Sequence, residues 1–378
     1  MEFIGYIWDW VIPFLVVFTI LVFVHEMGHY WVARLNKVRI EVFSIGFGPE
    51  LYGWHDRHGT RWKLSAVPLG GYVKMFGESQ EGTDDTEPAR PMSPADQAAS
   101  FHHKRLGQRA AIVAAGPAAN FVFAIVLFAG MFAIAGIPMP HAAVGDVQPD
   151  SAAAEAGLES GDRILSVDGE PVRWFDDLRA EVSGRPDTAL TLEVARDGET
   201  LRITATPKPT EVRIDGESQV IGLLGITPDP TQVGFDRLNP LAAVWTASER
   251  TVVMVGQILG AVWQMITGQR TAEELGGPLR IAQLSGEMAQ GGVVTLVFFM
   301  AVLSINLGLI NLFPVPMLDG GHLAFYAVEA VRGKPLDQKV QEYGFRLGLV
   351  LVLMLLVFVT WNDLVQLEVV EMVRRLVS

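Results

Sequence analysis

The residues best suited to chemistry stand together at His25-Glu26-Met27-Gly28-His29, near the end of an apolar run that begins at Pro13. Residues four apart on an α-helix share one face, so the two imidazoles point the same way. Two neutral imidazoles on one face can chelate Zn²⁺, and the adjacent glutamate can take a proton from zinc-activated water. The pattern therefore predicts His25 and His29 as metal ligands and Glu26 as general base.

A carboxylate far along the chain can supply the third ligand. Residues 311–322 read Asn-Leu-Phe-Pro-Val-Pro-Met-Leu-Asp-Gly-Gly-His, and the two prolines should end a helix because they lack the backbone donor. We expect Asp319 to lie in an irregular stretch and to complete a His₂–carboxylate set with one open position; His322 is the alternative ligand. A straight helix from Val293 would carry Asp319 past the depth of His25, unless the chain folds back at the prolines.

Composition indicates a mixed membrane and soluble protein. The chain has 378 residues, of which 50% are hydrophobic, and no cysteine, which excludes disulfides and thiol-ligated zinc. Its formal net charge of −13 argues against nucleic-acid binding. Apolar runs long enough to cross a bilayer predict four transmembrane helices, at 13–34, 110–135, 293–313 and 345–365. The first carries the histidine motif and is interpreted as a retained span, not a signal peptide.

Charge bias predicts the orientation. Residues 1–24 contain no lysine or arginine, whereas the loop after the first span is rich in both, so this loop should be cytoplasmic. Residues 136–292 then lie outside, with both termini. A fifth apolar stretch, 252–267, is short for a span and is interpreted as an amphipathic helix on the outer surface, with a fifth span as the alternative. Asn120, in the second span, is interpreted as a packing residue between helices.

The segment after the first span, residues 38–76, is rich in β-formers punctuated by glycine and predicts a membrane-associated region of β-hairpins. A strand edge beside a protease site can hold an extended substrate by main-chain hydrogen bonds. We therefore expect Gly70, Gly71 and Tyr72 to bind substrate; an ordinary cytoplasmic subdomain is the alternative.

Residues 143–210 predict a soluble α+β domain. Strand and turn signals at 161–169 are followed by a helix at 175–182 and by two further strands. This order, with Ala-Gly-Leu-x-x-Gly-Asp-Arg-Ile-Leu-x-Val-Asp-Gly, resembles the PDZ domains of bacterial membrane-linked proteases, and one such unit is present. A PDZ groove can receive an extended peptide by strand addition. The alternative is a plug or filter that binds nothing.

The expected segments, in chain order, are a first transmembrane helix with the histidine motif (1–37), a membrane-associated β region (38–76), a cytoplasmic loop (77–109), a second transmembrane helix (110–135), a PDZ-like domain (143–210), an outer-surface amphipathic segment (237–290), a third transmembrane helix with the Leu-Asp-Gly motif (293–331) and a fourth transmembrane helix (345–367). The fold class is thus a multi-pass α-helical membrane protein with a β-hairpin region and one periplasmic PDZ-like domain.

Taken together, several motifs resemble the bacterial site-2 protease family, of the regulator of sigma-E protease type. They are His-Glu-x-x-His, Gly-Gly-Tyr-Val-Lys-Met, Gly-Pro-x-x-Asn-Phe, the single PDZ-like insert and Asn-x-x-Pro-x-Pro-x-x-Asp-Gly-Gly. The resemblance implies zinc ligands His25, His29 and Asp319, with Glu26 as general base. It also implies that Asn311 and Asn306 help to hold the unwound substrate.

The resemblance further implies partners and a location. Members of the family cleave single-pass membrane proteins within the lipid bilayer, typically anti-sigma factors already trimmed outside and remnant signal peptides. They lie in the bacterial inner membrane, with the active site toward the cytoplasmic side. This chain departs from the best-known type in having one PDZ-like domain instead of two. The rival interpretations are a catalytically inactive PDZ membrane scaffold and a transporter, which would predict internal repeats that the sequence does not show.

Overall fold

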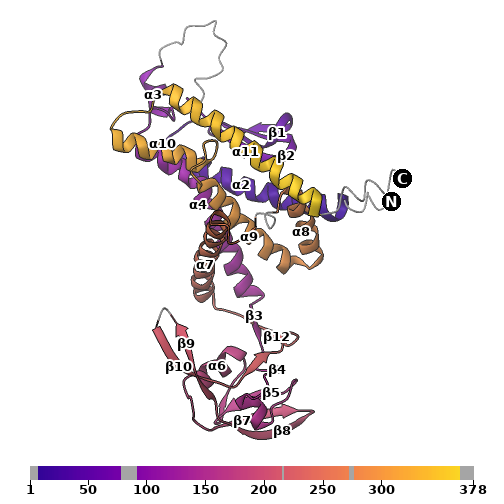
Figure 1. Cartoon of the computed structure of the whole chain (residues 1–378). Helices are drawn as coiled ribbons and strands as arrows, with labels where there is room; N and C mark the ends of the chain where they lie inside the picture. The colour runs from indigo at the N-terminus through magenta and orange to yellow at the C-terminus, as the bar shows by residue number, and fades with distance from the viewer. Residues whose placement is uncertain (1–6, 78–91, 215–216, 272–275, 367–378) are drawn as a thin grey trace, which may run out of the picture. The chain divides into compact units, whose positions relative to one another are not determined.

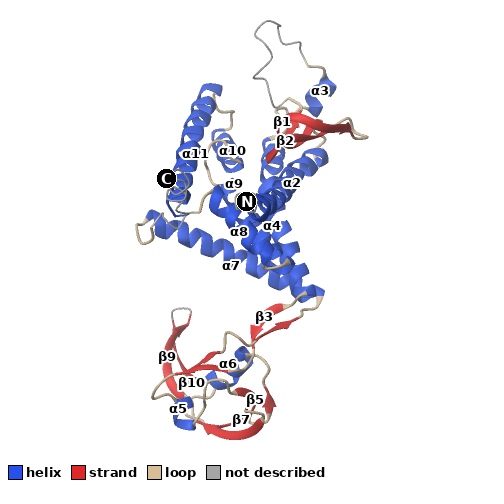
Figure 2. Ribbon diagram, turned by 90° about the vertical axis from the view of Figure 1, so that its right-hand side faces the viewer, coloured by secondary structure: helices blue, strands red, loops and turns tan. Residues whose placement is uncertain are grey.

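The computed structural model describes residues 7–77, 92–214, 217–271 and 276–366. The chain divides into two compact units, which Figures 1 and 2 show as a helical part and a strand-rich part. Unit 1 comprises residues 1–131 and 240–378, and unit 2 comprises residues 132–239. Part of the cytoplasmic loop predicted at 77–109, residues 78–91, lies outside the described residues.

Four helices of the described chain are long and apolar enough to cross a bilayer, as the sequence predicted. They are α2 (Ile12–Leu35), which continues a π-helical turn η1 (Ile7–Val11), α4 (Leu106–Ile134), α9 (Val293–Leu312) and α11 (Gln338–Gln366). The stretch expected at the outer surface forms α7 (Pro240–Ile266), which is not among these four, and is followed by α8 (Pro278–Gln290).

A carboxylate joins α8 to α11. Asp363 of α11 is 1% exposed and accepts hydrogen bonds from the backbone nitrogens of Gly277 (2.7 Å), Leu279 (3.0 Å) and Arg280 (3.1 Å). These nitrogens belong to the N-cap residue and the first turn of α8, where helix donors lack intrahelical partners. Asp363 therefore caps α8 from a neighbouring helix.

The β region is one long antiparallel hairpin, β1 (Ile40–His55) with β2 (Arg61–Met75), interrupted by several bulges. The half of the hairpin far from its turn packs on α2 and α4, where Phe43 and Val73 share a buried cluster with Tyr30. Asp56 organises the turn, because its side chain accepts hydrogen bonds from the nitrogens of His58 and Thr60. The hydroxyl of Tyr30 also donates to Asp56, at 2.9 Å, which ties the turn to the histidine-bearing helix. A short helix α3 (Pro94–Ala99) lies between the hairpin and α4 in the chain.

The chain reverses direction after α9. That helix ends at Leu312, and α10 (Asp319–Arg332) begins seven residues later. The expectation that Asp319 lies in an irregular stretch is wrong, because Asp319 is the first residue of α10. An acidic residue in the first turn stabilises a helix by its interaction with the helix dipole. Leu318, the N-cap residue before it, is extended. Gly320 and Gly321 allow the reversal, since a Cβ on Gly320 would overlap the carbonyl oxygen of Leu312.

Unit 2 contains a four-stranded sheet in the order β6-β5-β7-β8 (Glu170–Pro171, Arg163–Val167, Leu190–Arg196 and Glu199–Ala205). Two helices accompany it, α5 (Ala152–Ala156), which is followed by the C-cap residue Gly157 with φ 80°, and α6 (Phe175–Ser183). The buried core includes Ile164, Val167, Leu178, Leu190 and Leu192. These elements match the strand and helix order expected from the sequence.

The compact unit is wider than the predicted 143–210. Three further antiparallel pairs extend it: β3 with β12 (Ile137–Pro140 and Val233–Asp236), β4 with β11 (Val144–Val147 and Ile226–Pro228), and β9 with β10 (Lys208–Ile214 and Glu217–Leu223). β9 and β10 form a local hairpin, whereas β11 and β12 pair with β4 and β3 at the beginning of the unit. The pairing of β11 and β12 is long-range, so the local patterns of the sequence did not reveal it.

Candidate metal and catalytic site

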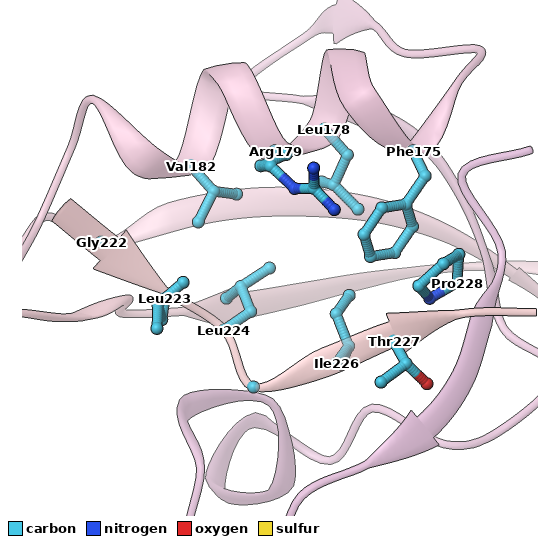
Figure 3. A pocket seen from close by; sticks show the side chains of 11 residues that line it. Phe175, Leu178, Arg179, Val182, Gly222, Leu223, Leu224, Ile226, Thr227 and Pro228 are labelled. Carbon is cyan, nitrogen blue, oxygen red and sulfur yellow. The ribbon is translucent and has the colours of Figure 1, made fainter. Parts of the chain in front are cut away.

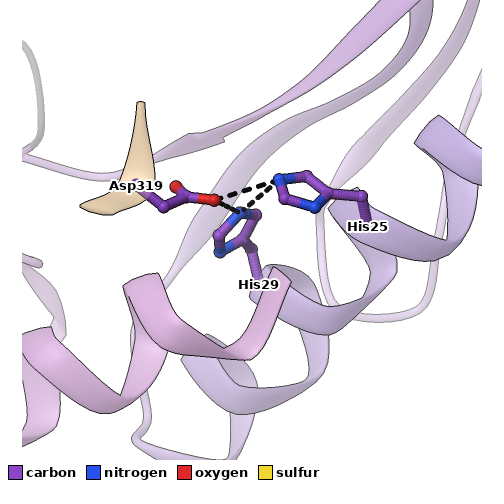
Figure 4. A group of neighbouring side chains, drawn as sticks. All are labelled: His25, His29 and Asp319. Atoms are coloured by element: carbon purple, nitrogen blue, oxygen red, sulfur yellow. Dashed lines mark hydrogen bonds and ion pairs between the residues drawn. The ribbon is translucent and has the colours of Figure 1, made fainter. Parts of the chain in front are cut away.

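Three side chains from two distant parts of the chain converge in unit 1 (Figure 4). His25 and His29 project from adjacent turns of α2, and their Nε2 atoms are 3.2 Å apart. Oδ2 of Asp319 lies 3.1 Å from Nε2 of His25 and 3.5 Å from Nε2 of His29. Both histidines are 9% exposed, so the cluster is inside the protein. The reversal between α9 and α10 is what carries Asp319 back to the depth of the histidines.

The spacing and chemistry of this group fit a zinc ion. Zinc ligands lie at about 2.0–2.2 Å from the metal in tetrahedral geometry, which separates neighbouring ligand atoms by roughly 3.4 Å. The three separations of 3.1, 3.2 and 3.5 Å agree with that value. Two imidazoles and one carboxylate also form a donor set used by catalytic zinc sites, which keep a fourth position open. His322 lies outside this group, and its ring packs at a tilt of 48° against Phe345, with ring centroids 5.1 Å apart.

One face of α4 contacts the two histidine rings at their Nδ1 atoms. Nδ1 of His29 lies 2.9 Å from the carbonyl oxygen of Ile112, and Nδ1 of His25 lies 3.2 Å from Nδ2 of Asn120. Gly116, halfway between these residues of α4, faces both rings, because a Cβ there would overlap Nε2 of His29. The spacing of four from 112 to 116 to 120 thus matches the spacing of four between the histidines.

Sequence reasoning assigned Asn120 to packing and did not connect it with the histidines. A signal was available, since Gly116 and Asn120 share a helix face with the same four-residue repeat. Small residues permit the close approach that the contact requires. A Cβ on Gly28 of α2 would overlap the backbone oxygen of Ala115, so α2 and α4 meet backbone to backbone.

The hairpin passes beside the glutamate of the motif. A Cβ added to Gly71 would lie 3.3 Å from Cγ of Glu26 and 2.8 Å from the oxygen of Ser44. Gly70 has a φ of +136°, a conformation that side-chain-bearing residues rarely adopt, and Tyr72 stacks on Phe47 with ring centroids 6.1 Å apart. The structure therefore brings the predicted segment of β2 next to Glu26.

The two asparagines predicted to hold substrate come from the third long apolar helix. Asn306 and Asn311 are both on α9 and both half-buried. Within the described residues, no hydrogen bond joins either amide to His25, His29 or Asp319.

Unit 2 contains an apolar groove of about 270 Å³ (Figure 3). One wall is α6, from which Phe175, Leu178 and Val182 point into the groove. The opposite wall is the extended segment 222–228, which includes Leu224. A cleft between a helix and an extended segment is suited to an extended peptide with apolar side chains.

Comparison with known proteins gives matches over nearly the whole chain. The model of peptidase family M50 matches residues 13–355. A protein of Agrobacterium fabrum, provisionally named a zinc metalloprotease, is 45% identical over 364 residues, covering 95% of this chain and 97% of that protein. The metalloprotease MmpA of Caulobacter vibrioides is 36% identical, covering 96% of this chain and 97% of that protein. The regulator of sigma-E protease RseP of Salmonella typhimurium is 31% identical, with 93% and 97% covered.

Two solved structures match part of the chain. The PDZ domain of an SdrC-like protein from Listeria monocytogenes is 20% identical, covers 23% of this chain and 84% of that domain, and gives a TM-score of 0.18. A protein of Geobacillus thermodenitrificans is 22% identical, covers 26% of this chain and 95% of that protein, and gives a TM-score of 0.17.

Proposed function

Because the chain belongs to peptidase family M50, whose members depend on zinc, we propose that it is an intramembrane zinc endopeptidase of the site-2 type. The observation that carries this proposal is the convergence of His25, His29 and Asp319 among long apolar helices. A buried ionisable cluster at such a position is costly unless it has partners, so it favours a functional site over a structural one.

His25, His29 and Asp319 would hold the metal through two Nε2 atoms and one carboxylate oxygen. When bound, zinc supplies Lewis-acid activation of a water molecule and of the scissile carbonyl group. Glu26 accepts the proton of the attacking water and then delivers it to the nitrogen of the leaving amine. Glu26 lies in the turn between the histidines, and Cγ of its side chain is close to Gly71 of β2.

Substrate must reach Glu26 as an extended chain, because the carbonyl groups of a helix are already hydrogen-bonded. The strand around Gly70, Gly71 and Tyr72 passes beside Glu26, and in this proposal it aligns the substrate main chain by strand addition. Asn306 and Asn311 of α9 would help to hold the unwound segment through their amides.

We assign the substrates to the transmembrane segments of single-pass proteins, in particular anti-sigma factors and remnant signal peptides, cut in regulated intramembrane proteolysis. The similarity to the protein named regulator of sigma-E protease supports this class. In the same proposal the protein lies in the bacterial inner membrane, with the active site toward the cytoplasm and unit 2 in the periplasm. The charge bias of the loops supports this orientation.

The experiment that tests this proposal measures substrate cleavage separately from zinc binding. Glu26→Gln and the control Glu342→Gln, which changes an exposed carboxylate paired with Arg346, are each expressed with a tagged single-pass substrate. Glu26→Gln should retain zinc and lose cleavage by roughly 10²-fold or more, because an amide cannot act as a base. The control should cleave as the wild type does. Cleavage at the wild-type rate by Glu26→Gln would exclude its assigned role, and an uncut substrate with the wild type would favour the inactive scaffold.

A further inference from the structure

We propose that Asn120 is a positioning residue for His25: its amide oxygen accepts a hydrogen bond from Nδ1–H and so leaves the Nε2 lone pair directed at the metal site. This inference rests on the proposed zinc site. Its starting point is that Asn120 is fully buried and that its amide meets Nδ1 of His25 at 3.2 Å. A neutral imidazole carries one proton, and the bond made by one ring nitrogen decides the state of the other.

His29 shows the arrangement that a metal ligand needs. Its Nδ1 lies 2.9 Å from the carbonyl oxygen of Ile112, and a carbonyl oxygen can only accept. Nδ1 of His29 must therefore carry the proton. Nε2 is left with its lone pair, and it is Nε2 that faces His25 and Asp319.

The contact of His25 allows two arrangements, because an amide offers both a donor and an acceptor. With Nδ2 of Asn120 toward the ring, Nδ1 of His25 must accept, and the ring proton moves to Nε2. That tautomer cannot bind a metal through Nε2, the atom that lies 3.1 Å from Asp319. With Oδ1 toward the ring, Nδ1 carries the proton and Nε2 is free to bind.

Burial favours the second arrangement. Oδ1 of Asn120 is buried and has no hydrogen-bond partner within the described part of the chain. A buried polar atom without a partner costs about 1–3 kcal/mol. A half-turn of the amide exchanges oxygen and nitrogen without moving the rest of the side chain, and it pairs Oδ1 with Nδ1–H. One change thus gives Oδ1 a partner and gives His25 the same tautomer as His29.

The backbone of Asn120 is held independently of its amide. Oγ of Ser304, on α9, donates to the backbone oxygen of Asn120 at 2.8 Å, and this serine is also fully buried. Removing that hydroxyl changes the packing around Asn120 and leaves its side chain intact. Ser304→Ala is therefore a control for helix packing.

The experiment measures the zinc affinity of the full-length purified protein by competition with a chelator. Asn120→Leu keeps the size of the side chain and removes the acceptor, so zinc affinity should fall by roughly 10–100-fold, the usual effect of losing a partner of a metal-binding histidine. Asn120→Asp retains an acceptor and should stay close to the wild type, as should Ser304→Ala. Asn120→Leu binding zinc as tightly as the wild type, or Asn120→Asp binding as weakly as Asn120→Leu, would overturn the inference.

A second measurement does not depend on the folding of any variant. In zinc-free wild-type protein with ¹⁵N-labelled histidine, the inference expects a protonated Nδ1 on His25, identified by the signal lost in His25→Gln. An unprotonated Nδ1 would contradict it. His25→Ala distinguishes this failure from failure of the site itself. If His25→Ala loses zinc while Asn120→Leu keeps it, only the role of Asn120 is rejected; if His25→Ala keeps zinc, the proposed site is wrong.

Discussion

Gly116 leaves no room for a side chain between α4 and the two histidine rings. This glycine is in the middle of α4, and a Cβ on it would overlap Nε2 of His29 and lie 2.8 Å from Cε1 of His25. Both atoms belong to rings fixed at their other nitrogen by Ile112 and Asn120, so neither ring can move aside without breaking a hydrogen bond. A methyl group would therefore be accommodated only by displacing an imidazole ring of the proposed metal site.

We expect Gly116→Ala to lower zinc affinity by 10-fold or more, because zinc binding depends on the orientation of each ligand and the methyl group would displace one of them. Gly130→Ala is the matched control, since it lies in the same helix and its Cβ would meet nothing within 4 Å. The measurement is chelator competition on both purified variants. Equal zinc affinity in the two variants would show that the rings adjust and that the close approach is unimportant.

Residue types and spacing were enough to nominate His25, Glu26, His29 and Asp319 as candidates, because zinc chemistry restricts which side chains can serve. The structure brings the two histidines and Asp319 together. The same reasoning could not find the role of Asn120. A buried amide has several possible partners, and its actual partner depends on which helix faces it and at what height. Those are properties of packing, which periodicity along one helix does not reveal.

At the scale of elements, the reversal between α9 and α10 decides whether the site exists. Pro314 and Pro316 end α9 as the sequence indicates. The return of the chain depends on Gly320 and Gly321, where a Cβ would overlap the backbone oxygens of Leu312 and Val315. It also depends on Gly348 of α11, where a Cβ would overlap the backbone oxygen of Pro316. A run of glycines permits such contacts but does not specify them, so the sequence left the depth of Asp319 open.

A buried ion pair predicts how unit 2 responds to acid. Asp162 is 1% exposed; burial alone would raise its pKa, but hydrogen bonds from Arg196 and from the backbone nitrogen of Glu159 outweigh burial and hold the pKa below its usual value. Arg196 donates twice to this carboxylate, at 2.6 Å each. A depressed pKa contributes stability that is present above the unfolded value of about 4 and is lost as the pH falls through the folded value.

Asp162→Asn should therefore lower the free energy of unfolding of unit 2 by about 2–3 kcal/mol near pH 7 and remove part of its loss of stability below pH ~4. Hydrogen exchange of the amides in β5 and β7, followed in the full-length protein, measures both effects. The control is Arg202→Gln, which breaks an exposed ion pair with Glu193 and should change stability by less than ~1 kcal/mol. The account of Asp162 fails if its variant is as stable as the control at neutral pH.

At the scale of the whole molecule, hydropathy predicted the four long helices because crossing a bilayer requires length and apolarity, both local properties. The extent of unit 2 was not predictable in this way. Its closing strands, β11 and β12, pair with β4 and β3 across more than 70 residues of chain, as between Ile226 and Val147. Short strands with non-local partners leave little signal in the sequence.

Orientation can be tested with single cysteines, since the chain contains none of its own. Ala95→Cys and Ser218→Cys introduce thiols at exposed positions on either side of the second span in the sequence. The proposed topology predicts that a membrane-impermeant maleimide added to spheroplasts labels Ser218→Cys alone, and that Ala95→Cys reacts only after lysis. Labelling of both cysteines from the same side would contradict the four-span orientation.

The central claim, that His25, His29 and Asp319 hold one catalytic zinc, is tested most directly by metal content. Purified wild-type protein should contain about one zinc per chain by elemental analysis, and His25→Ala and Asp319→Ala should each contain far less. The matched controls His103→Ala and Asp337→Ala remove an exposed histidine and an exposed aspartate outside the cluster, and both should retain the wild-type content. Undiminished zinc in both His25→Ala and Asp319→Ala would contradict the claim.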